Sequence, residues 1–192
     1  SDSHTKVWEG EKLSKKQANQ LSGIESIYFI DDFKGILSSI ATKVDTFYIN
    51  KNEHYRANSP VETREDRFIS WLLKKYPAHN VAKSNPILQR QRSIKHPDEI
   101  DQIKKACNIT RKGFNRVLEF IKPNVWEYEI EAEFIHEFIN NSSKGFAYSP
   151  IIASGNDNNV LHYIKNNKQC KSGELILMDV GAEYGNYSSD MT

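Results

Sequence analysis

The first part of the chain alternates strand-like runs with helical patterns. Residues 26–30 (SIYFI) and 45–50 (DTFYIN) have the aromatic and β-branched content typical of buried strands. Residues 31–41 and 61–76 show the apolar periodicity of helices, and Pro77 follows the second one. The side chains expected to face inward are Phe33, Ile36, Leu37 and Ile40 in the first helix, and Phe68, Ile69, Trp71, Leu72 and Leu73 in the second. This alternation predicts an α/β domain over residues 1–90.

A second domain is predicted over residues 91–192, beginning within the segment QRQRSIKHPDEI. Pro97 opens a helix that ends before Pro123, and acidic residues in its first turn suit the positive end of the helix dipole. Its apolar face is expected to contain Ile100, Ile103, Cys107, Thr110, Phe114, Val117 and Ile121. Residues 126–141 predict another helix, with Tyr128, Ala132, Ile135, Phe138 and Ile139 facing inward.

Strand patterns follow these two helices. They cover residues 146–154, 160–164 and 174–184, with a polar loop at 155–159 and a turn near 171–173. Two helices followed by strands predict an α+β domain in which the helices cover one face of a curved sheet.

Two aspartates stand out in the C-terminal stretch LILMDVGAEYGNYSSDMT. If Tyr184 and Gly185 form a two-residue hairpin turn, Asp179 lies directly opposite Asp190. Opposed like charges are destabilising unless they share a proton or hold a cation, so this register predicts a metal site. Two alternatives stay open at this point: turn or capping residues of no catalytic role, and an acid pair for glycoside hydrolysis.

Composition narrows the class of protein. The chain has 192 residues, 27% of them charged, and a formal net charge of +1, which argues against a nucleic-acid or membrane surface. No apolar run approaches the length of a membrane span, and no signal peptide is visible. The two cysteines, Cys107 and Cys170, lack metal-binding spacing and fit a reducing compartment, so we expect a cytoplasmic protein.

The segment LHYIKNNKQCKSGELILMDVGAEYGNYSSDMT resembles the start of the catalytic domain of aminopeptidase P, the Xaa-Pro aminopeptidases of the pita-bread (creatinase/aminopeptidase) metallopeptidase family. The positions that match the family pattern are Leu161, His162, Tyr163, Asn166, Gly173, Glu174, Asp179, Gly181, Glu183, Tyr184, Tyr187, Asp190 and Thr192. SIKHPDEI and KPNVWEYEIEAEF are similar to the entries into the family's first two catalytic-domain helices, although Asn124 stands where the family usually has Gly. The resemblance is strong over about residues 90–192 and weaker before them.

The resemblance implies a fold class, a reaction and a cofactor. The expected fold is part of an α/β creatinase-like N-terminal domain followed by the first part of an α+β pita-bread catalytic domain. Enzymes of this kind hold two divalent metal ions, commonly manganese, and remove the first residue from peptides with proline in second position. Asp179 and Asp190 match the family's two aspartate ligands, with Asp190 the bridging one. His162 matches an active-site histidine that contacts substrate without binding metal.

The resemblance also carries expectations about the rest of the protein. The His and two Glu that complete the family's metal site lie beyond Thr192, and KVWEGEKLS is similar to a segment midway through the family's N-terminal domain. We therefore expect a fragment that lacks both ends. Trp8 matches a tryptophan that enters the active site of a neighbouring subunit, which implies a homodimer or homotetramer; a core aromatic is the other interpretation of Trp8.

Other functions on the same fold stay open. A prolidase acting on dipeptides and a creatinase-like amidinohydrolase share the fold, but the WEG and LHY segments favour aminopeptidase P. A metal-free peptide- or protein-binding module on a pita-bread scaffold belongs to a different class. The retention of both Asp179 and Asp190 counts against such a module, because two facing carboxylates are costly without a cation.

Overall fold

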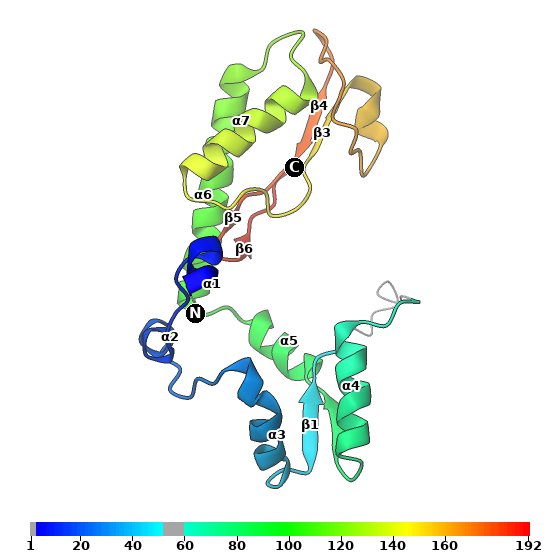
Figure 1. Ribbon diagram of the computed structural model, residues 1–192. Coiled ribbons are helices and arrows are strands. Elements are labelled where there is room, and N and C mark those ends of the chain that lie inside the picture. The colour runs from blue at the N-terminus through cyan, green and yellow to red at the C-terminus, as the bar shows by residue number, and fades with distance from the viewer. Residues whose placement is uncertain (1–2, 52–59) are drawn as a thin grey trace. The chain divides into compact units, whose positions relative to one another are not determined.

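The computed structural model describes residues 3–51 and 60–192, and the chain divides after Arg90 into two compact units. Figure 1 shows the helices and strands of each unit. Within the described residues of the first unit the elements are α1 (Ser3–Glu9), α2 (Lys15–Ser22), the short 3₁₀ helix η1 (Ile30–Asp32), α3 (Phe33–Ala41), β1 (Thr46–Ile49), α4 (Arg64–Lys75), β2 (Asn80–Lys83) and α5 (Asn85–Ser93), which crosses the division.

Strands β1 and β2 of the first unit pair in parallel, with Thr46 opposite Asn80. Helix α4 begins at a capping box, in which the Thr63 hydroxyl accepts from the Asp66 amide at 3.1 Å and the Asp66 carboxylate accepts from the Thr63 amide at 3.1 Å. The helix ends at Lys75, ahead of Pro77. The predicted helices at 31–41 and 61–76 and the predicted strand at 45–50 are therefore present.

The strand predicted at residues 26–30 is wrong. Residues 26–29 have no regular structure, and Ile30 begins η1. Tyr28, Phe29 and Ile30 are 59%, 61% and 77% exposed. Strand propensity is realised only where neighbouring strands and a packed face are present, and the described residues place no strand beside this run. Leu73 of α4, expected inside, is 45% exposed.

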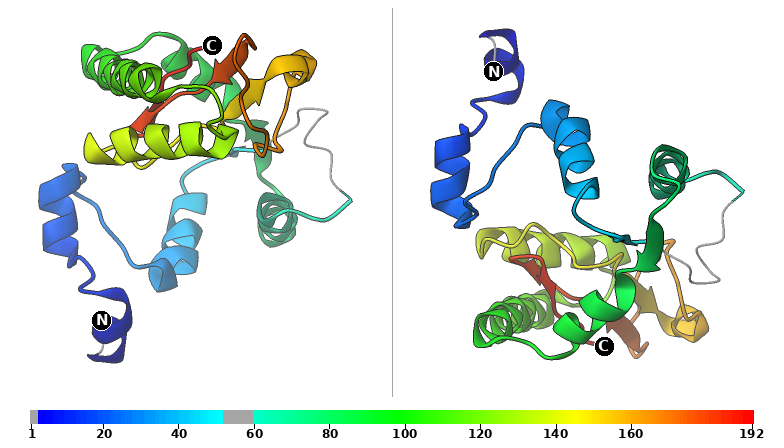
Figure 2. Two further views of the ribbon diagram at one scale, coloured as in Figure 1. Left: turned by 90° about the horizontal axis from the view of Figure 1, so that it is seen from above. Right: turned by 90° about the horizontal axis from the view of Figure 1, so that it is seen from below.

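The second unit contains two α-helices, two short antiparallel strand pairs and three isolated antiparallel bridges, and its buried residues form a large and a small cluster. Its elements are α6 (Pro97–Phe120), α7 (Glu127–Asn140), β3 (Ile151–Ser154), the 3₁₀ helix η3 (Gly155–Asn159), β4 (Ile176–Asp179), β5 (Glu183–Tyr184) and β6 (Tyr187–Ser188). Helices α6 and α7 pack against each other, β3 runs along α7, and β5 and β6 run along α6 (Figure 2). The strand predicted at 160–164 is wrong, because these residues form a turn and loop after η3.

Helix α6 occupies the predicted range and is capped as its sequence indicates. The His96 amide donates to the Glu99 carboxylate at 2.7 Å, and Pro97 occupies the first turn, where its missing N–H costs nothing. The helix ends at Phe120, three residues before Pro123.

The predicted inward face of α6 is confirmed in part, because Thr110 and Val117 are buried and Phe114 and Ile121 pack against the core. The buried face of α7 differs from the predicted one. Helix α6 buries Ala106, Ile109, Thr110, Gly113 and Val117, and α7 buries Glu127, Ile130, Phe134 and Phe138. Cys107, expected inside, is exposed, as are Tyr128, Ala132, Ile135 and Ile139.

Gly113 explains which face of α7 is buried. A Cβ at this position would lie 2.7 Å from Cε1 of Phe138 and 2.9 Å from Cδ1 of Phe134. The two phenylalanines therefore pack onto bare backbone of α6, and this close approach selects their stripe of α7 over the one that begins at Tyr128. The predicted inward stripe of α7 was wrong except for Phe138.

Candidate metal centre

Asp179 is the last residue of β4, and its place is fixed by pairing with β3. The two strands are antiparallel, with Ile151 opposite Asp179 and Ala153 opposite Leu177. Directly opposed residues share a face of the ribbon, and so do residues two apart on one strand. Ile151, Ala153, Leu177 and Asp179 therefore lie on one face, while Ile152 joins the core beneath the helices.

The hairpin after Asp179 turns one residue later than predicted. Gly185 and Asn186 form the loop, with φ of +60° and +67°, and Tyr184 pairs with Tyr187. A two-residue hairpin loop of this type needs positive φ at both of its residues. Gly and Asn adopt this conformation readily, whereas Tyr does not. The predicted Tyr184–Gly185 turn was wrong for this reason.

The change of turn shifts the pairing of the hairpin by two residues. Val180 bonds with Met191 through both backbone groups, at 2.9 and 3.1 Å, so Asp179 and Asp190 are diagonal neighbours and not directly opposed. A shift by one residue would have moved one carboxylate to the other face, whereas a shift by two keeps both on the same face. The predicted register was wrong, but the juxtaposition of the two carboxylates remains.

Tyr148 brings the two carboxylates to one point. Its hydroxyl lies 2.7 Å from Oδ1 of Asp179 and 2.8 Å from Oδ1 of Asp190. Burial is the larger cause, and the hydrogen bonds to the two carboxylates the smaller one, of a pKa of Tyr148 well above its ordinary value. The phenol therefore keeps its proton. One proton cannot satisfy two carboxylates at the same time, and the pair is left with excess negative charge that a cation would neutralise.

The sequence reasoning missed Tyr148. The residue lies within the predicted strand 146–154, where an aromatic side chain has an ordinary packing role. Only the pairing of β3 with β4 shows that a side chain three residues before Ile151 can reach Asp179. No signal within the sequence alone marks it.

Two buried hydroxyls hold the hairpin beside Asp190. The Ala182 amide donates to Oγ1 of Thr110 at 2.9 Å and to Oγ of Ser189 at 3.0 Å, and the two hydroxyls are 2.6 Å apart. A Cβ at Gly181 would lie 1.9 Å from the Ser189 carbonyl oxygen, so only glycine fits there. Helix α6 thereby fixes the segment after β6 that carries Asp190.

His162 lies in an exposed turn of the segment between η3 and Gln169. Tyr163, beside it, is only 5% exposed and packs with Ile151 and Ala153, with Leu177 against the same cluster. These are the side chains on the Asp179 face of the ribbon. The segment that carries His162 therefore covers the face that also carries Asp179.

Trp8 lies in the other unit, on α1. Its side chain is 76% exposed, and its ring centroid is 6.2 Å from that of His4. Asp179 and Asp190 belong to the second unit.

The residues of this site supply some of the ligands that a divalent cation needs. Two carboxylates that converge on one hydroxyl supply the hard oxygen ligands that such ions prefer. Over residues 3–51 and 60–192, no group of three or more His, Cys, Asp or Glu side chains could hold a metal ion. The two aspartates are therefore part of a ligand set. Cys107 and Cys170 are free thiols, and burial raises the pKa of Cys170.

Comparison with known proteins relates the residues of this site to a metallopeptidase family by sequence. Residues 101–192, which contain both aspartates, Tyr148 and His162, match metallopeptidase family M24. Residues 1–48 match the N-terminal domain of aminopeptidase P.

The M24 relatives include both sequences and solved structures. The chain is 29% identical to the Xaa-Pro aminopeptidase of Haemophilus influenzae over 97% of its own length and 41% of the relative's. It superposes with a TM-score of 0.91 on a Bacillus anthracis protein assigned as an aminopeptidase P, at 31% identity over 99% of this chain and 45% of the other. Zinc-substituted Escherichia coli aminopeptidase P gives a TM-score of 0.85 at 26% identity over 99% and 43%.

These matches confirm the predicted fold class and the family resemblance. The chain combines part of the aminopeptidase P N-terminal domain with the first part of the M24 catalytic domain, and it spans about two fifths of the length of the curated relatives. No helix in the described part of the chain is long and apolar enough to cross a membrane.

Proposed function

We propose that the full-length protein is a cytoplasmic, metal-dependent Xaa-Pro aminopeptidase that removes the first residue from peptides with proline in second position. The observation that carries the proposal is the convergence of Asp179 and Asp190 on the Tyr148 hydroxyl, within a region that matches a metallopeptidase family. The Xaa-Pro aminopeptidase names of the relatives support the substrate class.

In this proposal Asp179 and Asp190 would supply ligands to two divalent ions, which we propose to be manganese. When bound, the metal would activate water for attack on the peptide carbonyl and stabilise the negative charge that develops on its oxygen. Tyr148 keeps the two carboxylates in place through its shared proton. His162, exposed and on the segment that covers the Asp179 face, contacts the substrate near the scissile bond.

Selection of proline rests on its shape. Proline has no N–H and a fixed φ, so a pocket built for its ring discriminates against other residues. We propose that Trp8, exposed on α1, contributes to this pocket from a neighbouring subunit of a homodimer or homotetramer. The remaining metal ligands then come from sequence beyond residue 192.

The experiment that tests this function compares two substrates. Purified full-length protein is assayed on an Xaa-Pro-Yaa tripeptide and on an Xaa-Pro dipeptide, with and without a chelator, and again after Mn²⁺ is restored. We expect cleavage of the tripeptide only, loss on chelation and recovery with Mn²⁺. Preference for the dipeptide would assign the protein to the prolidases, and a rate that chelation leaves unchanged would remove metal from the reaction. Binding of Xaa-Pro peptides without turnover in the metal-loaded protein would indicate a binding module.

A further inference from the structure

Glu127, the first residue of α7, is a fully buried carboxylate that the proposed chemistry does not use. Its Oε1 accepts from the Ser154 amide and hydroxyl, each at 2.8 Å. Its Oε2 accepts from the Tyr163 hydroxyl at 2.8 Å and from the Lys168 amide at 3.0 Å. Four donors and the positive end of a helix compensate the burial of this charge.

These bonds join three separate segments of the chain. Glu127 stands at the start of α7, Ser154 ends β3, and Tyr163 and Lys168 belong to the segment that carries His162. Two further contacts reinforce the junction, because the Glu127 amide donates to the Lys168 carbonyl at 3.0 Å and the Lys168 ammonium donates to the Ser154 carbonyl at 2.9 Å. Every contact of the carboxylate is therefore made between elements, and none serves to cap α7.

The segment around His162 has few attachments of its own. Leu161 and Ile164 are 83% and 77% exposed, and Tyr163 is the buried side chain between them. Burial and the hydrogen bond to Glu127 raise the pKa of Tyr163 to about 12, so its hydroxyl remains a donor at neutral pH. Next to His162, the turn is thus anchored by the Tyr163 ring and its bond to Glu127. Further along the segment, Asn166 donates to Glu131, and Lys168 bonds with Glu127 and Ser154.

We propose that Glu127 is a positioning residue for His162: it holds Tyr163 and Lys168, and through them it fixes the turn that presents the histidine on the Asp179 face. This inference rests on the proposed role of His162 in substrate contact. A carboxylate is required because all four partners are donors. Glutamine at this position would turn an NH₂ group toward one pair of donors.

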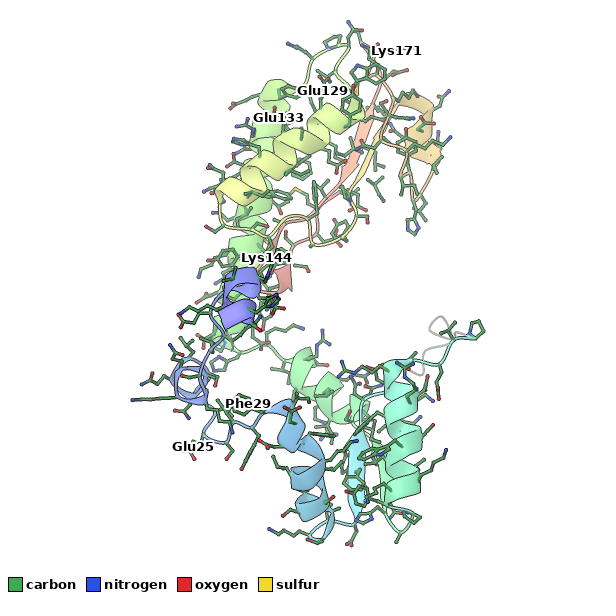
Figure 3. All side chains as sticks on the ribbon, in the orientation of Figure 1. Glu25, Phe29, Glu129, Glu133, Lys144 and Lys171 are labelled. Atoms are coloured by element: carbon green, nitrogen blue, oxygen red, sulfur yellow. The ribbon has the colours of Figure 1, made fainter. Side chains whose placement is uncertain are left out.

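The test compares E127Q and Y163F with E129Q in the full-length protein. Glu129 lies two residues further along α7 (Figure 3) and accepts from the Trp126 amide, so its substitution removes the same charge from the same helix end without touching the His162 segment. E127Q should lower kcat by about 10- to 100-fold, the loss typical of a misplaced active-site group, with metal content unchanged. Y163F should also lower kcat, and E129Q should leave kcat unchanged.

Two further readouts separate positioning from general damage. In an H162A background, E127Q should cause little additional loss, because the two substitutions remove the same contact. Amide hydrogen exchange over residues 160–168 should accelerate in E127Q and Y163F and not in E129Q. Additive losses, or unchanged exchange in both E127Q and Y163F, would overturn the inference.

The two proposals can fail separately. If the parent protein cleaves no Xaa-Pro peptide, the proposed function fails, and hydrogen exchange still decides whether Glu127 holds the segment. If E127Q does not fold, Y163F removes one donor and keeps the buried ring, so the same readouts remain available.

Discussion

A single hydroxyl, that of Tyr148, contacts both carboxylates of the proposed metal site. Its one proton lies between two carboxylate oxygens, at 2.7 and 2.8 Å, and it keeps them close while leaving their charge incompletely compensated. Side chains that orient metal ligands in this way typically contribute about 10- to 100-fold to metal affinity or activity.

Tyr148→Phe should therefore weaken divalent-ion binding by about 10- to 100-fold while leaving the fold intact, since the ring is retained. Titration calorimetry of the full-length protein with Mn²⁺ measures the first effect and thermal unfolding the second. Unchanged ion affinity would show that Asp179 and Asp190 are held by the hairpin alone.

Asp179→Ala or Asp190→Ala should abolish turnover on Xaa-Pro-Yaa peptides. Neither aspartate is buried, so removal of either carboxylate leaves no cavity in the core, and the fold should persist. Circular dichroism and metal analysis accompany the assay. Peptidase activity retained by either variant would contradict the assignment of these residues as ligands.

His162→Ala should lower kcat by about 10²- to 10⁴-fold, as expected for a lost proton-transfer or oxyanion contact. The histidine is exposed, and we place it in contact with substrate and not with metal. Metal content, measured by elemental analysis, should therefore equal that of the parent. Loss of metal would mean that His162 is a ligand.

Packing between the elements of the second unit depends on a glycine that only the structure explains. Gly113 allows the Phe134 and Phe138 rings of α7 to lie on the backbone of α6. By contrast, a Cβ at Gly35, within α3, would meet nothing within 4 Å. The two glycines lie inside helices but have opposite surroundings.

Gly113→Ala should lower the free energy of unfolding by about 1–3 kcal/mol, because the added methyl group overpacks the α6–α7 interface. Gly35→Ala should raise it by about 0.5–1 kcal/mol through helix propensity and reduced unfolded-state entropy. Urea denaturation of both variants measures the two changes in the free energy of unfolding. A stabilised Gly113→Ala variant would show that the two rings give way at little cost.

Helices α6 and α7 differ in how much of their structure the sequence predicts. The range of α6 could be predicted because Pro97, the acidic first turn and Pro123 are local signals. The buried face of α7 could not, because the helix is apolar on two sides and Gly113, far along the chain, decides between them.

The candidate site likewise contains residues that local sequence patterns predict and one residue that they do not. Local patterns and the family resemblance predict Asp179, Asp190 and His162 as site residues, whereas Tyr148 is indicated only by the pairing of β3 with β4 and its contact with Asp179. The hairpin register was misjudged by two residues because Gly185 is flanked by Tyr184 and Asn186, and the turn needs positive φ at two consecutive positions. The preference of Asn over Tyr for that conformation was the signal that should have decided it.

At the scale of the whole molecule, Trp8 offers a decisive test of the proposed assembly. Its side chain is 76% exposed within its own chain, and His4 is its ring contact. If a neighbouring subunit's active site receives Trp8, Trp8→Ala should raise KM for Xaa-Pro-Yaa peptides and leave Tm unchanged. Dilution of the parent protein below the dissociation constant of the oligomer should then reduce specific activity. If Trp8 is instead a core aromatic of the complete N-terminal domain, the same substitution should lower the free energy of unfolding by about 3–5 kcal/mol and leave KM unaltered. Steady-state kinetics and thermal unfolding on one variant, with sedimentation of the parent across the same concentrations, therefore separate an intersubunit contact from a packing role.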